Sequence, residues 1–66
     1  MNLKALTTTQ STVFYLLIQG KSNTEIAQAL EIAEKTVKTH VTGIFKKLKC
    51  KSRAQVIARH YMEQLA

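Results

Sequence analysis

Apolar residues along the chain recur every three or four positions, and no stretch alternates apolar and polar residues with the period of two expected of a strand. The predicted fold class is therefore all-α. Gly20 ends the first helix, and the short segment 31–33 separates the second helix from the third. The pattern predicts four helices, at residues 8–19, 23–30, 34–48 and 53–66.

Three of the four predicted helix starts carry a residue pair with capping-box spacing. In such a pair the side chain of the N-cap residue accepts from a backbone N–H three residues later, and the later side chain returns a bond to the cap. These reciprocal bonds favour helices with defined starts, as in a packed bundle. The predicted pairs are Thr7 with Gln10, Ser22 with Glu25, and Ser52 with Gln55.

The length of 66 residues allows one small domain, residues 1–66, with a single modest core. Its longest wholly apolar run, residues 13–18, is far shorter than the roughly 20 residues of a membrane-spanning helix, and no signal peptide precedes the predicted fold. Cys50 is the only cysteine, so an internal disulfide is excluded. We read Cys50 as a small semi-buried residue, and the chain as a cytoplasmic protein.

Positive charge is concentrated in the second half of the chain. The net charge is +6, yet residues 1–34 hold two lysines against three glutamates. Residues 35–66 hold eight lysines and arginines against Glu63 alone. This asymmetry favours a polyanionic partner, with nucleic acid ahead of an acidic membrane surface. A solvated basic face without a partner is the alternative that charge by itself leaves open.

A short helix, a three-residue turn and a longer helix make up a helix-turn-helix layout over residues 23–48. Ala27 is small where the two helix axes approach each other, and Ile32 is expected to fill the turn. Val37 stands one turn into the longer helix, where it can pack back on the shorter one. Other three-helix bundles share this spacing, so the layout alone does not establish the motif.

The third helix has two faces of different chemistry. Val37, Val41, Ile44 and Leu48 form an apolar stripe, expected to be buried. A second stripe, within a sector of about 100°, contains lysine and threonine and no acid. Lysine can donate to guanine, and threonine can contact a base edge or the thymine methyl, so this stripe is suited to the major groove of DNA. Its members are Lys35, Lys38, Thr39, Thr42, Lys46 and Lys49.

Three segments, "LTTTQ", "GKSNTEIAQALEIAEKTVKTHVTGIFKKL" and "KSRAQVIA", together resemble the LuxR-type helix-turn-helix domain of bacterial transcription regulators. These regulators include response regulators related to the nitrate-response regulator. The resemblance covers residues 6–60 and implies a four-helix domain whose recognition helix is at about 34–48. It also implies sequence-specific binding to double-stranded DNA, with the chain as the C-terminal part of a longer regulator of the two-component response regulator class. A stand-alone LuxR-type regulator is the alternative.

The resemblance also assigns roles to individual positions. Lys38, Thr39 and Thr42 match positions that contact bases. The fourth helix is expected to join two copies on DNA as a homodimer, through Val56 and Met62, unless it is fully covered as a core helix. RNA polymerase is a further candidate partner. The predicted phosphate contacts are Ser22, Asn23, Lys35, Thr36, Lys46, Lys47, Lys51, Ser52 and Arg53.

Four positions depart from the family pattern. Gln10 stands in place of a glutamate, and Ala33 in place of the serine that usually caps the recognition helix. Loss of that cap costs about 1 kcal/mol. Gly43 lies inside the same helix, where glycine costs roughly 1 kcal/mol relative to alanine. Lys49 follows the helix where the family often has glycine, so a different helix end is expected. These changes affect local stability and sequence preference rather than the fold.

Other function classes have less support in the sequence. No nucleophile motif or phosphate-binding glycine loop occurs, so we expect no enzyme and no cofactor. His40 and His60 have no second ligand at helical spacing, so we expect no metal site. A protein-interaction module on the same scaffold would depend on apolar residues of the fourth helix rather than on Lys38. A peptide bound to a membrane surface would leave its apolar faces exposed.

Overall fold

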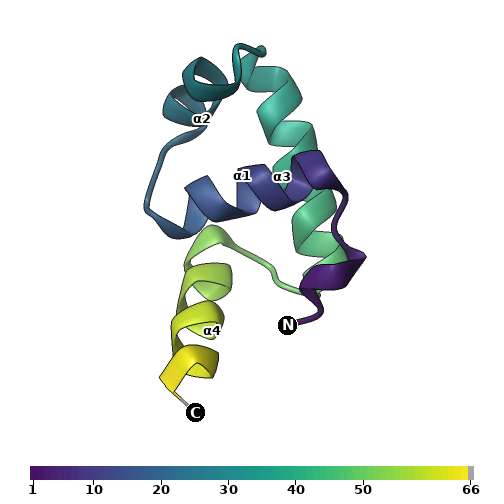
Figure 1. Cartoon of the computed structure of the whole chain (residues 1–66), viewed down its shortest axis with the longest axis vertical. Coiled ribbons are helices and arrows are strands. Elements are labelled where there is room, and N and C mark those ends of the chain that lie inside the picture. Colours follow the sequence, from purple (N-terminus) through teal and green to yellow (C-terminus); the bar gives the residue numbers. More distant parts are fainter. Residues whose placement is uncertain (66) are drawn as a thin grey trace.

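The computed structural model describes residues 1–65 as one short 3-10 helix followed by four α-helices (Figure 1). No strand occurs in this part of the chain, and the all-α prediction is confirmed. The sequence does not predict η1, because three residues are too few to establish a periodicity. The elements are η1 (Leu3–Ala5), α1 (Thr8–Ile18), α2 (Asn23–Leu30), α3 (Glu34–Leu48) and α4 (Arg53–Leu65).

The capping boxes of α1 and α2 form as predicted. At α1, Thr7 Oγ1 accepts from the Gln10 N–H at 3.1 Å, and Gln10 Oε1 accepts from the Thr7 N–H at 3.0 Å. At α2, the same exchange joins Ser22 and Glu25 at 3.1 and 2.9 Å. Each box satisfies two backbone donors that a helix start leaves free.

The start of α4 differs from the prediction in one bond. The Gln55 N–H donates to Ser52 Oγ at 3.1 Å, as a capping box requires. The Gln55 side chain, however, accepts at 2.6 Å from the N–H of Lys51, one residue before the cap. The box prediction is therefore half correct: the backbone bends enough before α4 to bring the earlier N–H within reach.

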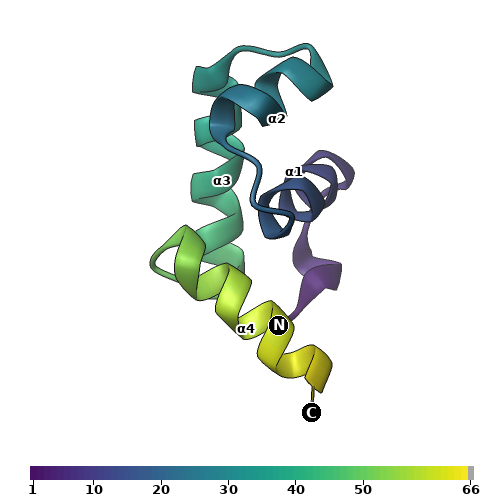
Figure 2. The same ribbon diagram turned by 90° about the vertical axis from the view of Figure 1, so that its left-hand side faces the viewer.

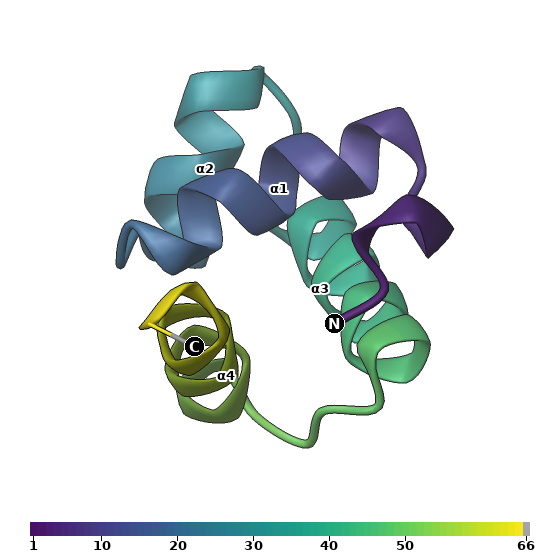
Figure 3. The ribbon, with the colours of Figure 1, turned by 60° about the horizontal axis from the view of Figure 1, so that its bottom comes forward.

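The apolar stripe of α3 lies at the centre of the core. Val37 and Ile44 are fully buried, and Val41 and Leu48 are nearly so. α3 packs against both α1 and α2, and Figure 3 shows α1 crossing it. Burial of the apolar faces is the opposite of what a membrane-surface peptide requires. The other buried apolar residues are Val13, Phe14, Leu17, Ile26, Ala27, Cys50 and Val56.

α4 packs mainly on α1, and its C-terminal half projects beyond the other helices (Figure 2). Val56 has no exposed surface, so its side chain belongs to the core. The prediction that Val56 contributes to a dimer surface is therefore wrong. Met62, by contrast, is 68% exposed and remains available to a second copy. No helix within residues 1–65 has both the length and the apolar character to cross a membrane.

Polar contacts over long sequence separations fix α4 against the rest of the domain. The Arg53 guanidinium donates to Asn23 Oδ1 at 2.7 Å and also to the Lys21 carbonyl. Arg59 donates to the Leu48 carbonyl at 3.1 Å, at the C-terminal end of α3 where a cation is favoured. These bonds tie the start of α4 to α2 and its middle to α3.

The end of α3 places a lysine in a backbone conformation that favours glycine. Lys49 has φ 56° and ψ 42°, which is the left-handed helical region. The Cys50 N–H bonds back to the Phe45 carbonyl at 2.9 Å, so the helix closes with the bond pattern of a Schellman motif. The expectation of a different helix end is wrong: the geometry of a glycine cap is kept, with lysine in the strained position.

Replacing Lys49 with glycine should stabilise the domain. The left-handed conformation costs a residue with a Cβ about 1 kcal/mol, and glycine removes that cost. Urea unfolding should give Lys49→Gly a free energy of unfolding about 1 kcal/mol above that of Lys49→Ala. The alanine variant loses the same charge but keeps the Cβ, so equal midpoints for the two variants would contradict a strained helix end.

Replacing Arg53 with lysine should destabilise the domain although the charge is kept. A single ammonium group cannot reach both Asn23 Oδ1 and the Lys21 carbonyl as the forked guanidinium does. Loss of these two bonds, of which the one to Asn23 is partly buried, should lower the free energy of unfolding by about 1 kcal/mol. The control is Lys51→Arg, the reverse exchange at an exposed position. Equal stability of the two variants would show that the guanidinium contacts contribute nothing.

Candidate nucleic-acid interface

α2 and α3 form the predicted helix-turn-helix unit (Figure 2). Glu31 adopts the left-handed conformation at the end of α2, and the Ile32 N–H bonds back to the Ala27 carbonyl at 3.1 Å. Ile32 is half-buried against the core and Ala27 is buried, as the sequence predicts for the turn and the helix crossing. The turn therefore holds α3 at a defined angle against α2.

The start of α3 has no side-chain cap, as expected with Ala33 at that position. A bond from the neighbouring helix supports it instead: Thr24 Oγ1 donates to Glu34 Oε1 at 2.8 Å. The Glu34 carboxylate also lies in the first turn of α3, where the helix dipole favours negative charge. The first turn of α3 is thus tied to the first turn of α2.

The second stripe of α3 lies on the surface of the domain. Its six residues are all exposed, whereas the apolar stripe of the same helix is buried. α3 therefore presents a continuous basic and hydroxyl-bearing surface, without an acid, over most of its length. We call this surface the recognition face: Lys35, Lys38, Thr39, Thr42 and Lys46 of α3, and Lys49, which follows the helix directly in the left-handed conformation.

Backbone hydrogen bonds orient both threonines of the recognition face. Thr39 Oγ1 donates to the Lys35 carbonyl at 3.2 Å, and Thr42 Oγ1 donates to the Lys38 carbonyl at 3.0 Å. Each hydroxyl proton is used within the helix, while the oxygen keeps a lone pair for an outside donor. Each threonine can therefore offer an acceptor oxygen and a methyl group to a ligand, while its hydroxyl proton stays bonded to the helix backbone.

The predicted phosphate contacts fall into two groups. Most are exposed on the surface: Lys35, Thr36, Lys46, Lys47, Lys51, Ser22 and Ser52. Asn23 and Arg53 are half-buried and bonded to each other, so the fold already uses part of their hydrogen-bonding capacity. Sequence spacing gives no sign of this pairing, because the two residues are 30 positions apart. The bond links the start of α2 to the start of α4.

A carboxylate lies in the first turn of α2, beside Ser22 and Asn23. The backbone N–H of Ser22 donates to Glu25, and this bond is the main reason that the pKa of Glu25 lies below its ordinary value. The Ser22 hydroxyl and the positive charge of Lys21 lower this pKa further. Glu25 is therefore ionised at neutral pH. Its negative charge partly offsets the positive partial charge at the start of α2, where a phosphate would bind.

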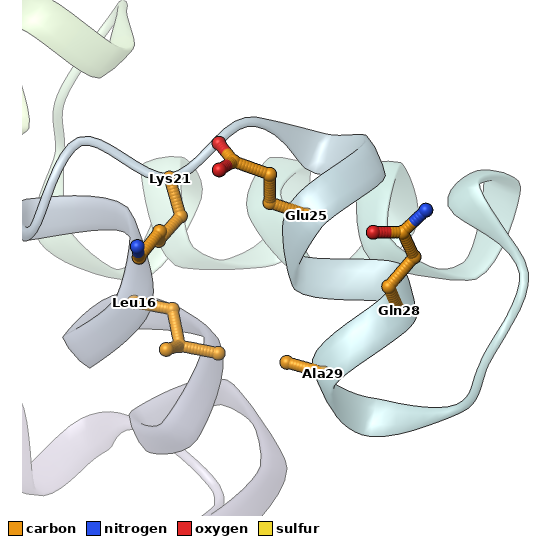
Figure 4. Close-up of a pocket in the computed structure, with 5 residues that line it drawn as sticks. All are labelled: Leu16, Lys21, Glu25, Gln28 and Ala29. Atoms are coloured by element: carbon orange, nitrogen blue, oxygen red, sulfur yellow. The ribbon is translucent and has the colours of Figure 1, made fainter.

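Two surface grooves lie away from the recognition face. One, of about 410 Å³, is lined by residues of α1, α2 and the turn between them, and Figure 4 shows Lys21 and Glu25 at its rim. The other, of about 450 Å³, lies between the start of α1 and the helix-turn-helix turn. His40 lines this second groove, and the described residues contain no cluster of metal-ligating side chains. No residue of the recognition face lines either groove.

Comparison with known proteins agrees with this arrangement. Residues 4–60 match the family model described as bacterial regulatory proteins, luxR family. The chain is 44% identical over 52 residues to the spore germination protein GerE of Bacillus subtilis. The aligned segment covers 79% of this chain and 70% of GerE. It is 47% identical over 55 residues to a glycerol metabolism activator of Pseudomonas putida, covering 83% of this chain and 25% of the activator.

A response regulator protein, VraR of Staphylococcus aureus, is 40% identical over 60 residues. The match covers 91% of this chain and 29% of VraR. The chain therefore spans between a quarter and a third of the length of the activator and of VraR, and most of GerE. The family match over residues 4–60 and the similarity to GerE place the chain among the bacterial regulatory proteins of the LuxR family.

Proposed function

We propose that this chain binds double-stranded DNA in a sequence-specific manner, as the DNA-binding domain of a bacterial transcription regulator. The observation that carries the proposal is the recognition face. It is an exposed stripe of lysine and threonine on the second helix of a helix-turn-helix unit, and the opposite side of that helix is buried in the core. In this motif the second helix enters the major groove.

Three residues of the recognition face are proposed to read bases. Lys38 can donate to O6 and N7 of guanine. Thr39 and Thr42 keep an acceptor oxygen and a methyl group facing outward, because their protons are bonded to the helix backbone. The oxygen suits an amino group of adenine or cytosine, and the methyl suits the methyl of thymine. The fixed threonine rotamers reduce the entropy lost on binding.

The remaining basic and polar positions are proposed to contact phosphates. Lys35 and Thr36 lie at the start of α3, Lys46 and Lys47 at its end, and Lys51 and Ser52 before α4. Ser22 and Asn23 add the start of α2. Arg53 is the weakest member of this set, since its guanidinium already serves Asn23 and Lys21. Such contacts release counterions and set the register on the duplex.

We further propose a cytoplasmic, two-component response regulator as the context, with no enzyme activity in this domain. The similarity to a protein named as a response regulator supports this choice. GerE, of which this chain covers 70%, supports the alternative of a short regulator without a separate input domain. RNA polymerase is the proposed partner for activation in either case.

A homodimer on DNA is proposed to form through the exposed end of α4. One copy offers few base contacts, and two copies on neighbouring half-sites double the number. Met62 and Leu65 are 68% and 84% exposed. Contact between large apolar side chains and water is unfavourable, so a second copy that covers both residues would gain free energy. The same surface could instead serve a protein-interaction module, which would bind its partner without the recognition face.

Lys38→Ala should remove the sequence preference of DNA binding. The wild-type domain should prefer a few duplexes from a genomic pool over random sequence. Its affinity should fall with salt at a slope of about −0.9 per phosphate contacted. The measurement is fluorescence anisotropy over a salt series, with Lys4→Ala as the control, because Lys4 is also exposed but lies in η1. Weak binding that Lys38→Ala leaves unchanged would refute the proposed function.

Met62→Glu should abolish cooperative binding to a duplex with two half-sites and leave binding to one half-site nearly unchanged. A carboxylate cannot be buried between two copies without a partner, and Met62 is exposed in the monomer, so folding should be unaffected. Gln64→Glu makes the same charge change at an exposed position of α4. Equal loss of cooperativity in the two variants would mean that Met62 is not part of the dimer surface.

A further inference from the structure

The start of α1 meets α3 through the side chain of Gln10, a residue to which the family resemblance assigns no DNA contact. Gln10 Oε1 accepts from the Thr7 N–H at 3.0 Å and from the Lys47 ammonium at 2.8 Å. One oxygen thus joins the cap of α1 to the last turns of α3. The two donors fix both the position and the orientation of the amide plane, because the oxygen has to face them.

Gly43 makes this position of the amide sterically feasible. A Cβ atom on residue 43 would lie 2.7 Å from Gln10 Nε2, closer than two such atoms approach. The amide of Gln10 therefore rests on the bare backbone of α3. Glycine weakens the interior of a helix relative to alanine, and the close approach of Gln10 is the local reason for accepting it here.

The amide nitrogen of Gln10 is left with unused donors. Nε2 carries two N–H groups and has no hydrogen-bond acceptor within residues 1–65. Gln10 is half-buried, and no fully buried side-chain nitrogen or oxygen in this part of the chain lacks a partner, so Nε2 keeps some solvent-exposed surface. Gly43 lies four positions after Thr39 and three before Lys46, so the free donors lie at the margin of the recognition face.

We propose that Gln10 and Lys47 form a phosphate clamp, and that Gln10 is a DNA contact contributed by α1. The inference rests on the proposed function. Oε1 holds the Lys47 ammonium next to the amide, so Nζ and Nε2 flank the same oxygen. A phosphate group of the DNA backbone at this corner accepts from both, and the neutral amide adds donors without cancelling the lysine charge.

A carboxylate at position 10 would fit the same space and fail as a clamp. It would still accept from Thr7 and Lys47, so the capping box and the contact with α3 would persist. It has no donor for a phosphate, and its charge would neutralise Lys47 and repel the DNA. Gln10→Glu therefore separates the role of this residue in folding from its role in binding.

The first test compares Gln10→Glu with Ser11→Glu on the preferred duplex. Ser11 is the exposed neighbour in α1, so the two variants carry the same added charge. Gln10→Glu should bind about tenfold more weakly than Ser11→Glu, with a salt slope shallower by about 0.9, while both unfold at the wild-type urea concentration or above. Equal affinities and equal slopes for the two variants would overturn the clamp.

The second test is a double-mutant cycle between positions 10 and 43. Gly43→Ala should displace the amide and lower affinity severalfold in the wild type, because the new Cβ would lie only 2.7 Å from Nε2. In the Gln10→Ala background the same change should have no further effect on affinity. An equal loss in both backgrounds would mean that the alanine methyl meets the DNA directly, and the clamp would be rejected.

Lys38→Ala, measured in parallel, separates the two hypotheses. If Lys38→Ala loses sequence preference while Gln10→Glu matches Ser11→Glu, the proposed function holds and the clamp fails. If the wild-type domain shows no preference and no salt dependence, both fail together. Loss of preference in Lys38→Ala, together with the selective loss of affinity and slope in Gln10→Glu, supports both.

Discussion

The buried stripe of α3 is the contact on which the rest of the molecule depends. Val37, Val41, Ile44 and Leu48 enter the core between α1 and α2, and this packing determines the rotation of α3 about its own axis. Because the helix is rigid, the same rotation places the lysine and threonine stripe in solvent. One apolar contact therefore both stabilises the domain and exposes its recognition face.

The core is small, and polar contacts between helices supplement it. A domain of this length buries only about 60% of its unfolded surface, so bonds at helix ends carry an unusual share of its stability. Arg53 joins the start of α4 to α2, Arg59 reaches the end of α3, and Thr24 joins α2 to Glu34. All lie at a helix end or reach one, where free backbone groups and dipoles make polar contacts most favourable.

Charge in this domain is arranged for binding rather than for stability. The second half of the chain is strongly basic, yet its lysines are exposed and form no ion pair within residues 1–65. Self-repulsion of this kind weakens a fold slightly and strengthens attraction to a polyanion. Lys47 is the instructive case, since its partner within the domain is a neutral amide and its charge stays available.

The sequence by itself determined the helices, two complete capping boxes, the helix-turn-helix turn and the two faces of α3. Each depends on residues within a few positions of one another, where helical periodicity and capping chemistry are decisive. Only the tertiary structure decided the rest. It placed Val56 in the core, because α4 is apolar around much of its circumference and periodicity cannot say which side its neighbours cover. It likewise paired Arg53 with Asn23, and Gln10 with Gly43 and Lys47, because those residues meet only when helices distant in sequence pack together.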